Sequence, residues 1–446
     1  MITFFKLKVI IDPFCNQERA NGCAIVSHYL IVLCCYGSGG VCALVDLRSL
    51  DQKRLLDSIF SRAAKGSRIV KDPEPLRPDY IPPKLLFRDE QIAAVAQIVA
   101  PILRRQRCSN LLLYGKTGTG KTATARLVLK ELATKARDLS LSVCLCYSNC
   151  RLAGTEYRVV LDLAEAVGVK LPFTGLSLGE AYSRVASQIS NGNLNLLVVL
   201  DEIDFLAKNS SGNLLYELTR SHDMLSPGSV SLIGISNDLR FKELLDPRVL
   251  SSLGEEEMVF PPYSVEELRL ILEDRVKLAF NEGCISDAAL NLCAALAGSE
   301  HGDARRAVDL LRVSAEVAER EGSQRVEERH IRIALQKMEQ DRLVEALRVL
   351  PLQAKLILLA VVRCETTPTT GSIYKTYTNL SERVGVETLT PRRVSGILSE
   401  LDMQGLISAD VLSKGRYGRS KQVSLLVPKS LILDVFAQDP VVSSLV

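Results

Sequence analysis

The sequence lacks a strong net charge, a regular cysteine framework and a long uninterrupted apolar run. Its 55 basic and 52 acidic residues leave a net charge of only +3, so any surface for nucleic acid has to be local. Its 12 cysteines include no paired C-x-x-C modules, which disfavours zinc and favours buried thiols in a reducing cytosol. The apolar stretch 23–36 is interrupted at Ser27 and His28 and is shorter than the roughly 20 residues of a membrane span. We therefore expect no membrane partner.

The length and composition predict a globular protein of several domains. With 446 residues the prior is about two to four domains, and 47% hydrophobic residues is an ordinary share. Residues 1–45 hold five cysteines and show no clean periodicity, so we hypothesise that they are not a native folded unit and that the true start lies near Val45. Residues 46–88 read as a charged amphipathic helix followed by a proline-rich linker.

A glycine-rich segment after the apolar run Leu111–Tyr114 organises the chain. It reads Gly115, Lys116, Thr117, Gly118, Thr119, Gly120, Lys121 and Thr122. This order fits the P-loop pattern G-x-x-x-x-G-K-[ST], in which backbone N–H groups and the following helix hold phosphates. A helix is expected from Ala123 to about residue 133. Lys121 would reach the β- and γ-phosphates and the Thr122 hydroxyl would bind Mg²⁺. A glycine-rich surface turn would not need Lys-Thr at its end.

Two acidic residues follow another buried apolar run, over residues 194–200. Asp201 would hold Mg²⁺ and Glu202 would orient or deprotonate an attacking water. An acidic helix cap is the plain alternative, but the P-loop roughly eighty residues upstream favours the catalytic interpretation. Asn237 ends the next apolar strand and could face the γ-phosphate. Arg305, at the start of a later helix, could report the phosphate state, although a solvated helix arginine would look the same.

The order of elements predicts an α/β fold in which a P-loop parallel sheet is followed by a helical lid and a winged helix. Strands alternate with helices over residues 89–262, which indicates a parallel sheet covered on both faces, with a helical insertion at about 155–190. Residues 263–345 are wholly helical. Residues 351–446 read as three helices and two strands, which fits a winged helix.

The terminal section also carries a local cluster of cations. A helix starting at Pro391 and a basic hairpin tip would meet a groove and a backbone of duplex DNA. The predicted DNA contacts are Arg392, Arg393, Ser395, Lys414, Arg416, Tyr417, Arg419 and Lys421. A solvated loop is the alternative, but so many cations on a nearly neutral chain favour DNA.

At this point the sequence resembles the archaeal origin-recognition initiator family, the Orc/Cdc-type AAA+ ATPases, over residues of about 70–440. The resemblance rests on an ordered set of motifs, including YGKTGTGKTATAR (114–126), LPFTGLS (171–177), LVVLDEIDFL (197–206) and GDARRAVDLLR (302–312). In such ATPases, Asn237 and Arg305 hold the sensor 1 and sensor 2 positions. The resemblance also implies that residues 171–177 touch DNA.

The resemblance implies a nucleotide site and partners as well. It adds Pro82, Leu86, Phe87, Arg88, Ala123 and Tyr263 to the expected ATP-binding residues. It implies ATP or ADP with Mg²⁺, slow ATP hydrolysis, double-stranded origin DNA, the MCM helicase and other initiator copies as partners, and a nucleoid-associated place in the cytoplasm. The sequence departs from the family at one place. Arg248 is a candidate arginine finger, but the later position that is basic in related subunits is occupied by Ser251-Ser252.

Three functions are compatible with these features. The leading one is a replication initiator that binds origin duplex DNA under ATP/ADP control and helps to load the MCM helicase. A clamp-loader-like or DNA-remodelling ATPase would instead turn over rapidly in a ring. A transcription regulator would use only the winged helix and would not need Glu202.

Overall fold

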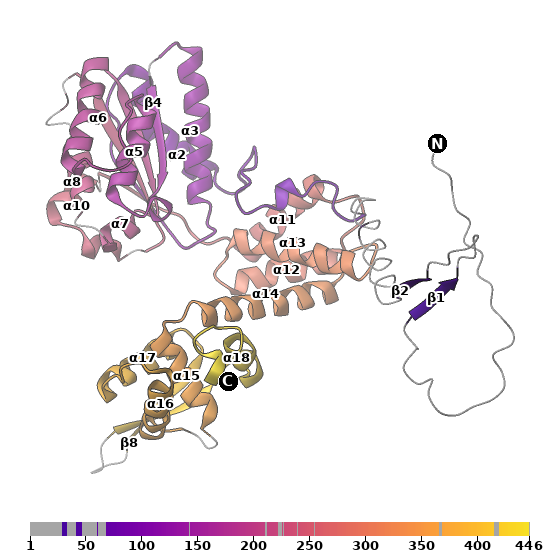
Figure 1. The fold of residues 1–446 in the computed structure, drawn as a ribbon. Helices are drawn as coiled ribbons and strands as arrows, with labels where there is room; N and C mark the ends of the chain where they lie inside the picture. Colours follow the sequence, from indigo (N-terminus) through magenta and orange to yellow (C-terminus); the bar gives the residue numbers. More distant parts are fainter. Residues whose placement is uncertain are drawn as a thin grey trace, which may run out of the picture. The chain divides into compact units, whose positions relative to one another are not determined.

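The structure is a computed structural model, drawn in Figure 1. It describes residues 29–33, 42–46, 60 and 68–445, apart from 142, 210–211, 222–224, 226, 239, 254, 365–367 and 414–418. The chain divides into the units Met1–Arg68 and Ile69–Val446. In the first unit, β1 (Tyr29–Leu33) pairs antiparallel with β2 (Cys42–Asp46). The hypothesis on residues 1–45 and the helix expected from residue 46 lie largely outside the described residues.

A five-stranded parallel sheet forms the first part of the second unit, as the alternation of strands and helices predicts. Its strand order is β4-β5-β6-β3-β7. The strands are β3 (Leu111–Tyr114), β4 (Val143–Asn149), β5 (Asn195–Asp201), β6 (Ser229–Ser236) and β7 (Glu256–Val259). Every residue of β5 is buried, because helices cover both faces of the sheet.

Alternate residues of the central strands pack against different helices. On one face, Leu197 and Val199 of β5 share a cluster with α2 (Asp89–Val99) and α3 (Lys121–Asp138). On the other face, Leu196, Val198 and Leu200 pack with α5 (Glu156–Ala166) and α6 (Leu178–Gly192). The period of two along the strand therefore gives each helical layer its own core. The short elements of this region are η2 (Ala100–Arg104), α4 (Cys150–Ala153), α7 (Asp204–Asn209), α8 (Asn213–Thr219), η3 (Phe241–Leu244) and α10 (Pro247–Leu253).

Four helices follow the sheet and build the lid. They are α11 (Val265–Ala279), α12 (Asp287–Ser299), α13 (Ala304–Arg320) and α14 (Glu328–Arg348). Ser264 and Glu267 form the predicted capping box at the start of α11. Ile69, and Leu76 of η1 (Glu74–Leu76), are buried in the lid core, so the start of the linker packs on the lid. The last turn of α14 instead places Leu347 in the next hydrophobic core.

The terminal section has the predicted winged-helix order. It contains α15 (Leu352–Arg363), α16 (Thr370–Val384), α17 (Pro391–Met403), the antiparallel pair β8 (Ile407–Ser413) and β9 (Arg419–Leu425), α18 (Lys429–Phe436) and η5 (Ser443–Leu445). Thr390 caps α17 by accepting a hydrogen bond from the Arg393 N–H, and Pro391 occupies the first turn. Among the described helices, none combines the length and the apolar character needed to cross a membrane.

Candidate nucleotide-binding site

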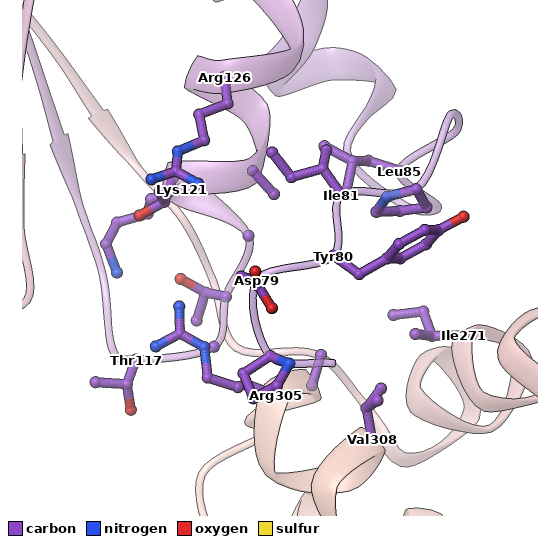
Figure 2. A pocket seen from close by; sticks show the side chains of 18 of the residues that line it. Asp79, Tyr80, Ile81, Leu85, Thr117, Lys121, Arg126, Ile271, Arg305 and Val308 are labelled. Carbon is purple, nitrogen blue, oxygen red and sulfur yellow. The ribbon is translucent and has the colours of Figure 1, made fainter. Parts of the chain in front are cut away.

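A cavity of about 400 Å³ lies where the linker, the glycine-rich loop, the strand ends and the lid meet. Figure 2 shows Thr117 and Lys121 of the loop and Arg305 of the lid around the same space, with Tyr80 and Ile81 of the linker beside it. The predicted site residues that line this cavity are Pro82, Leu86, Thr117, Gly118, Thr119, Gly120, Lys121, Thr122, Ala123, Asp201, Glu202, Asn237, Tyr263 and Arg305. Residues scattered over more than two hundred positions therefore surround one cavity.

Sheet register brings the polar residues together. Tyr114 at the end of β3 pairs with Ser236 of β6, and Asp201 at the end of β5 pairs with Ile235. The loop after β3, the carboxylates after β5 and Asn237 after β6 consequently leave the same edge of the sheet. In parallel sheets this carboxyl edge is where ligands bind.

Close approach of the lid explains one glycine of the loop. Gly118 has a φ of +68°, and a Cβ atom there would lie 1.7 Å from Asp303 Oδ1. The Thr117 hydroxyl donates to Asp303 Oδ2 at 3.1 Å, and the Ala304 N–H donates to the Gly118 carbonyl at 3.2 Å. The N-terminus of α13 therefore sits directly on the loop, and a larger residue at 118 would displace it.

Lys121 is the first residue of α3, two positions earlier than the expected helix start. Its side chain is only 4% exposed, and Nζ donates to the carbonyls of Gly115 and Lys116 at 2.8 and 2.6 Å. Burial lowers the pKa of Lys121 to about 8; Asp201 opposes this shift and Arg305 adds to it. Gly115 and Lys116 contact the amine but do not line the cavity.

Asp201 receives two hydroxyl donors on one carboxylate oxygen. The Thr122 hydroxyl lies 2.9 Å and the Tyr147 hydroxyl 2.7 Å from Asp201 Oδ2. The guanidinium of Arg126 stacks over the Tyr147 ring at 4.2 Å. A hydroxyl and a carboxylate that converge at one end of the cavity fit Mg²⁺, which prefers oxygen ligands and keeps several waters. Sequence reasoning missed Tyr147 and Arg126 as site residues, because Tyr147 stands in no quoted motif and Arg126 lies beyond the phosphate-binding pattern at 115–122.

Glu202 has a strained backbone and is held by polar neighbours. Its φ of +53° is unusual for a residue other than glycine. Asn149 Nδ2 donates to Glu202 Oε1 at 3.3 Å, and Arg151 lies 3.7 Å from Oε2. Asn149 also caps α4, which fixes the position of its amide. These contacts hold Glu202 beside β4.

The two adjacent lid arginines point to different partners. Arg305 is exposed and lines the cavity, whereas Arg306 pairs with Glu300 within the lid. This separation follows from the 100° step between neighbours on a helix. Arg248, the candidate finger, is exposed at the start of α10.

The part of the cavity where the adenine base was expected departs in part from expectation. Pro82 and Leu86 line it, but Phe87 and Arg88 do not. Phe87 adopts a left-handed backbone with a φ of +59°, which turns Arg88 into the interior, where it is 2% exposed. The apolar wall missed by sequence reasoning consists of Tyr80, Ile81, Leu85, Ile271 and Val308.

The predicted DNA contacts lie on α17 and the following hairpin. Arg392 and Arg393 are exposed in the first turn, without an ion pair to any described carboxylate, and Ser395 is half-buried. Lys421 of β9 donates to the Ser399 hydroxyl on α17. Lys414, Arg416 and Tyr417 lie outside the described residues, and of Arg419 the structure describes only the backbone, in β9.

Comparisons with known proteins agree with this architecture. Three family models match: an AAA domain over residues 104–242, a Cdc6 AAA+ ATPase-type lid domain over 269–336 and a CDC6 C-terminal winged helix domain over 345–435. The chain is 47% identical over 392 residues to the ORC1-type DNA replication protein of Thermococcus onnurineus, covering 86% of this chain and 94% of the relative. It is 48% identical to ORC1-type DNA replication protein 1 of Aeropyrum pernix, covering 87% and 100%.

Solved structures show the same fold. The structure of the Aeropyrum pernix ORC1 protein in complex with DNA matches with a TM-score of 0.77 at 48% identity, over 85% of this chain and 100% of that one. Cdc6p from Pyrobaculum aerophilum, at 24% identity, matches with a TM-score of 0.54 over 82% and 98%. The second likeness concerns the fold alone. The chain thus belongs to the archaeal Orc1/Cdc6 family of DNA replication initiators.

Proposed function

We propose that this initiator binds duplex origin DNA and is switched by the exchange of ATP and ADP. The observation that carries the proposal is the convergence of Lys121, Asp201 and Arg305 on one cavity. A buried amine, a carboxylate beside a hydroxyl and a lid guanidinium match the charges of a magnesium triphosphate. The apolar wall at the other end, with Ile81 and Leu85, suits a purine base.

Each group has a distinct part in slow ATP hydrolysis. Lys121 would leave its two carbonyl partners for phosphate oxygens, and Thr122 and Asp201 would hold Mg²⁺. When bound, Mg²⁺ neutralises charge on the β- and γ-phosphates. Glu202 would accept a proton from the attacking water, and Asn237 would orient that water. Because Asn149 and Arg151 already engage Glu202, turnover should be slow.

The lid provides the switch. Arg305 and Asp303 lie at the N-terminus of one helix, and Asp303 accepts a hydrogen bond from Thr117 of the loop. A γ-phosphate would attract the guanidinium and repel the carboxylate, so ATP and ADP would favour different lid positions. The nucleotide would thus act by setting the conformation.

DNA binding is proposed for the winged helix. Arg392 and Arg393 are exposed without ion pairs to any described carboxylate, and Lys421 lies against α17. These cations can neutralise phosphates, while Ser395 could meet a base edge. The relative from Aeropyrum pernix was solved in complex with DNA, which supports the proposal. Loading of the MCM helicase, contact with other initiator copies and a nucleoid-associated place in the cytoplasm are further proposals that rest on the family.

The central test combines nucleotide binding with footprinting. Lys121→Ala should abolish ATP and ADP binding, whereas Lys337→Ala, a lid substitution outside the cavity lining, should leave it unchanged. DNase footprinting across the replication origins should show protection by the wild-type chain, with a different extent in ATP and in ADP. Tight ATP binding by Lys121→Ala, or identical footprints in both nucleotides, would contradict the proposal.

A further inference from the structure

Arg88 is a buried cation that joins three segments of the chain. Its Nε donates to the Thr119 carbonyl of the glycine-rich loop at 2.9 Å. One terminal nitrogen donates to the Phe87 carbonyl of the linker at 2.8 Å, and the other to the Pro261 carbonyl at 2.7 Å. The side chain therefore ties the loop and the linker to the connection between sheet and lid.

An aromatic ring, and no carboxylate, faces the guanidinium. Its central carbon lies 3.7 Å from the centroid of the Tyr263 ring. No described carboxylate lies within ion-pair distance of Arg88. Burial lowers the pKa of Arg88, and the facing Tyr263 and the more distant Glu267 oppose this fall. Carbonyl dipoles and a π face thus compensate this charge. Arginine suits such a position because its planar fork can hold several acceptors in fixed directions.

The contacts act on the loop where its N–H groups must face phosphates. The Thr119 carbonyl accepts from Arg88, whose side chain does not line the cavity, and the next residue, Gly120, has a φ of +93°. A Cβ atom on Gly120 would lie 2.9 Å from the Tyr263 hydroxyl, so this tyrosine supports the loop from the same side. Because Arg88 binds the Thr119 carbonyl, the N–H groups that follow it along the loop are free to point toward the expected phosphates.

The same cluster continues into the lid. The Tyr263 N–H donates to the Gly302 carbonyl at 3.3 Å. Gly302 directly precedes Asp303, which contacts the loop. Arg305, which lines the cavity, follows two residues after Asp303. A Cβ atom on Gly302 would lie 2.4 Å from the Tyr263 carbonyl, so the contact depends on glycine. Arg88 and Tyr263 therefore link the back of the loop to the start of α13.

We propose that Arg88 is a positioning residue for the nucleotide phosphates. It holds the glycine-rich loop in its phosphate-binding conformation from behind and couples that conformation to the lid through Tyr263. This inference rests on the proposed nucleotide site but gives Arg88 a role away from the base pocket. It implies that substitutions of Arg88 lower the affinity for ligands that carry phosphates and leave the affinity for adenosine nearly unchanged.

The experiment measures binding of ATP, ADP and adenosine to the full-length chain. Arg88→Gln and Arg88→Lys should each lose at least about tenfold in affinity for ATP and ADP, because several charge-assisted hydrogen bonds are lost or misaligned. Adenosine affinity, measured by ligand-observed NMR, should stay within about twofold, since its contacts lie at the apolar end. Arg306→Gln, which breaks a lid ion pair outside the cavity, is the matched control and should bind all three ligands normally.

Two further measurements separate positioning from general destabilisation. Amide hydrogen exchange without ligand should be faster over residues 116–122 and at Tyr263 and Ser264 in Arg88→Gln, and unchanged over β5. Tyr263→Leu, which removes the facing ring, should reproduce the phosphate-dependent loss if Arg88→Gln does not fold. Equal loss for adenosine and ATP, or ATP affinity within about twofold of wild type while Lys121→Ala has lost binding, would overturn the role of Arg88. Tight ATP binding by Lys121→Ala would instead refute the nucleotide site itself.

Discussion

The buried amine of Lys121 predicts that the proposed binding of nucleotide weakens as the pH rises above about 8. Its pKa falls to about 8 from an ordinary value of 10.5, mainly because the side chain is only 4% exposed. The neutral amine can still donate to the carbonyls of Gly115 and Lys116, so deprotonation preserves these two contacts. A bound triphosphate favours the charged form and should raise this pKa again.

The magnitude follows from the titration of a single group. With a pKa of about 8, about nine-tenths of the free protein carries charged Lys121 at pH 7 and about one-tenth at pH 9. If the charged form alone binds phosphates, affinity for ATP falls about tenfold between these values. Each nucleotide bound at pH 9 should take up about 0.9 proton, against about 0.1 at pH 7.

Titration calorimetry in buffers of different ionisation enthalpy measures this proton uptake directly. Lys121→Arg is the matched control, because a guanidinium stays charged throughout and should show no uptake from this position. The lowered pKa also means that the unfolded chain binds more protons between pH 8 and 10.5, so the nucleotide-free protein should gain stability over this window. An uptake near zero at pH 9 in the wild-type protein would refute the reasoning.

Three further predictions follow from contacts around the cavity and on α17. Gly118→Ala should move α13 off the loop, because its Cβ would lie 1.7 Å from Asp303, and should weaken ATP binding without unfolding the sheet; unchanged small-angle scattering and affinity would contradict this. Tyr147→Phe removes one donor to Asp201 and should change the Mg²⁺ concentration that half-saturates ATP binding, while magnesium-free ADP binding stays constant. Arg392→Ala combined with Arg393→Ala should lower the slope of log affinity against log salt for duplex DNA by about 1 to 2. Arg416→Ala combined with Arg419→Ala should lower this slope by a similar amount. An unchanged slope would show that the substituted residues do not contact DNA.

Local motifs made the clustering of polar residues at one end of the cavity predictable. Lys121, Thr122 and Asp201 stand in short patterns whose chemistry requires those residue types, and the parallel sheet expected from alternating elements brings their strand ends together. The expectation for Asn237 needed only that it follow an apolar strand. The Cdc6-type lid and winged helix were equally accessible, because capping residues and helical periodicity mark their elements.

The apolar end of the cavity could not be predicted from the sequence in the same way. Its wall is formed by Ile81, Ile271 and Val308, which are far apart in sequence and resemble any other core residues. The family resemblance assigned Arg88 to this wall, but the left-handed backbone at Phe87 sends it into the interior. The edge strand β7 was missed because its first residues, Glu256 and Glu257, are exposed and lack the apolar pattern of a buried strand.

The helix α14 gives this protein a mechanical connection between its two helical cores. Ile331 and Ala334 near its start are buried in the lid core, and Leu347 near its end is buried in the winged-helix core. A helix of 21 residues is a stiff rod of about 30 Å. A rotation of the lid by about 10° would therefore move the far end of this helix by roughly 5 Å. A movement of the lid would thus be passed to the winged-helix core, because α14 runs between the two cores without a break.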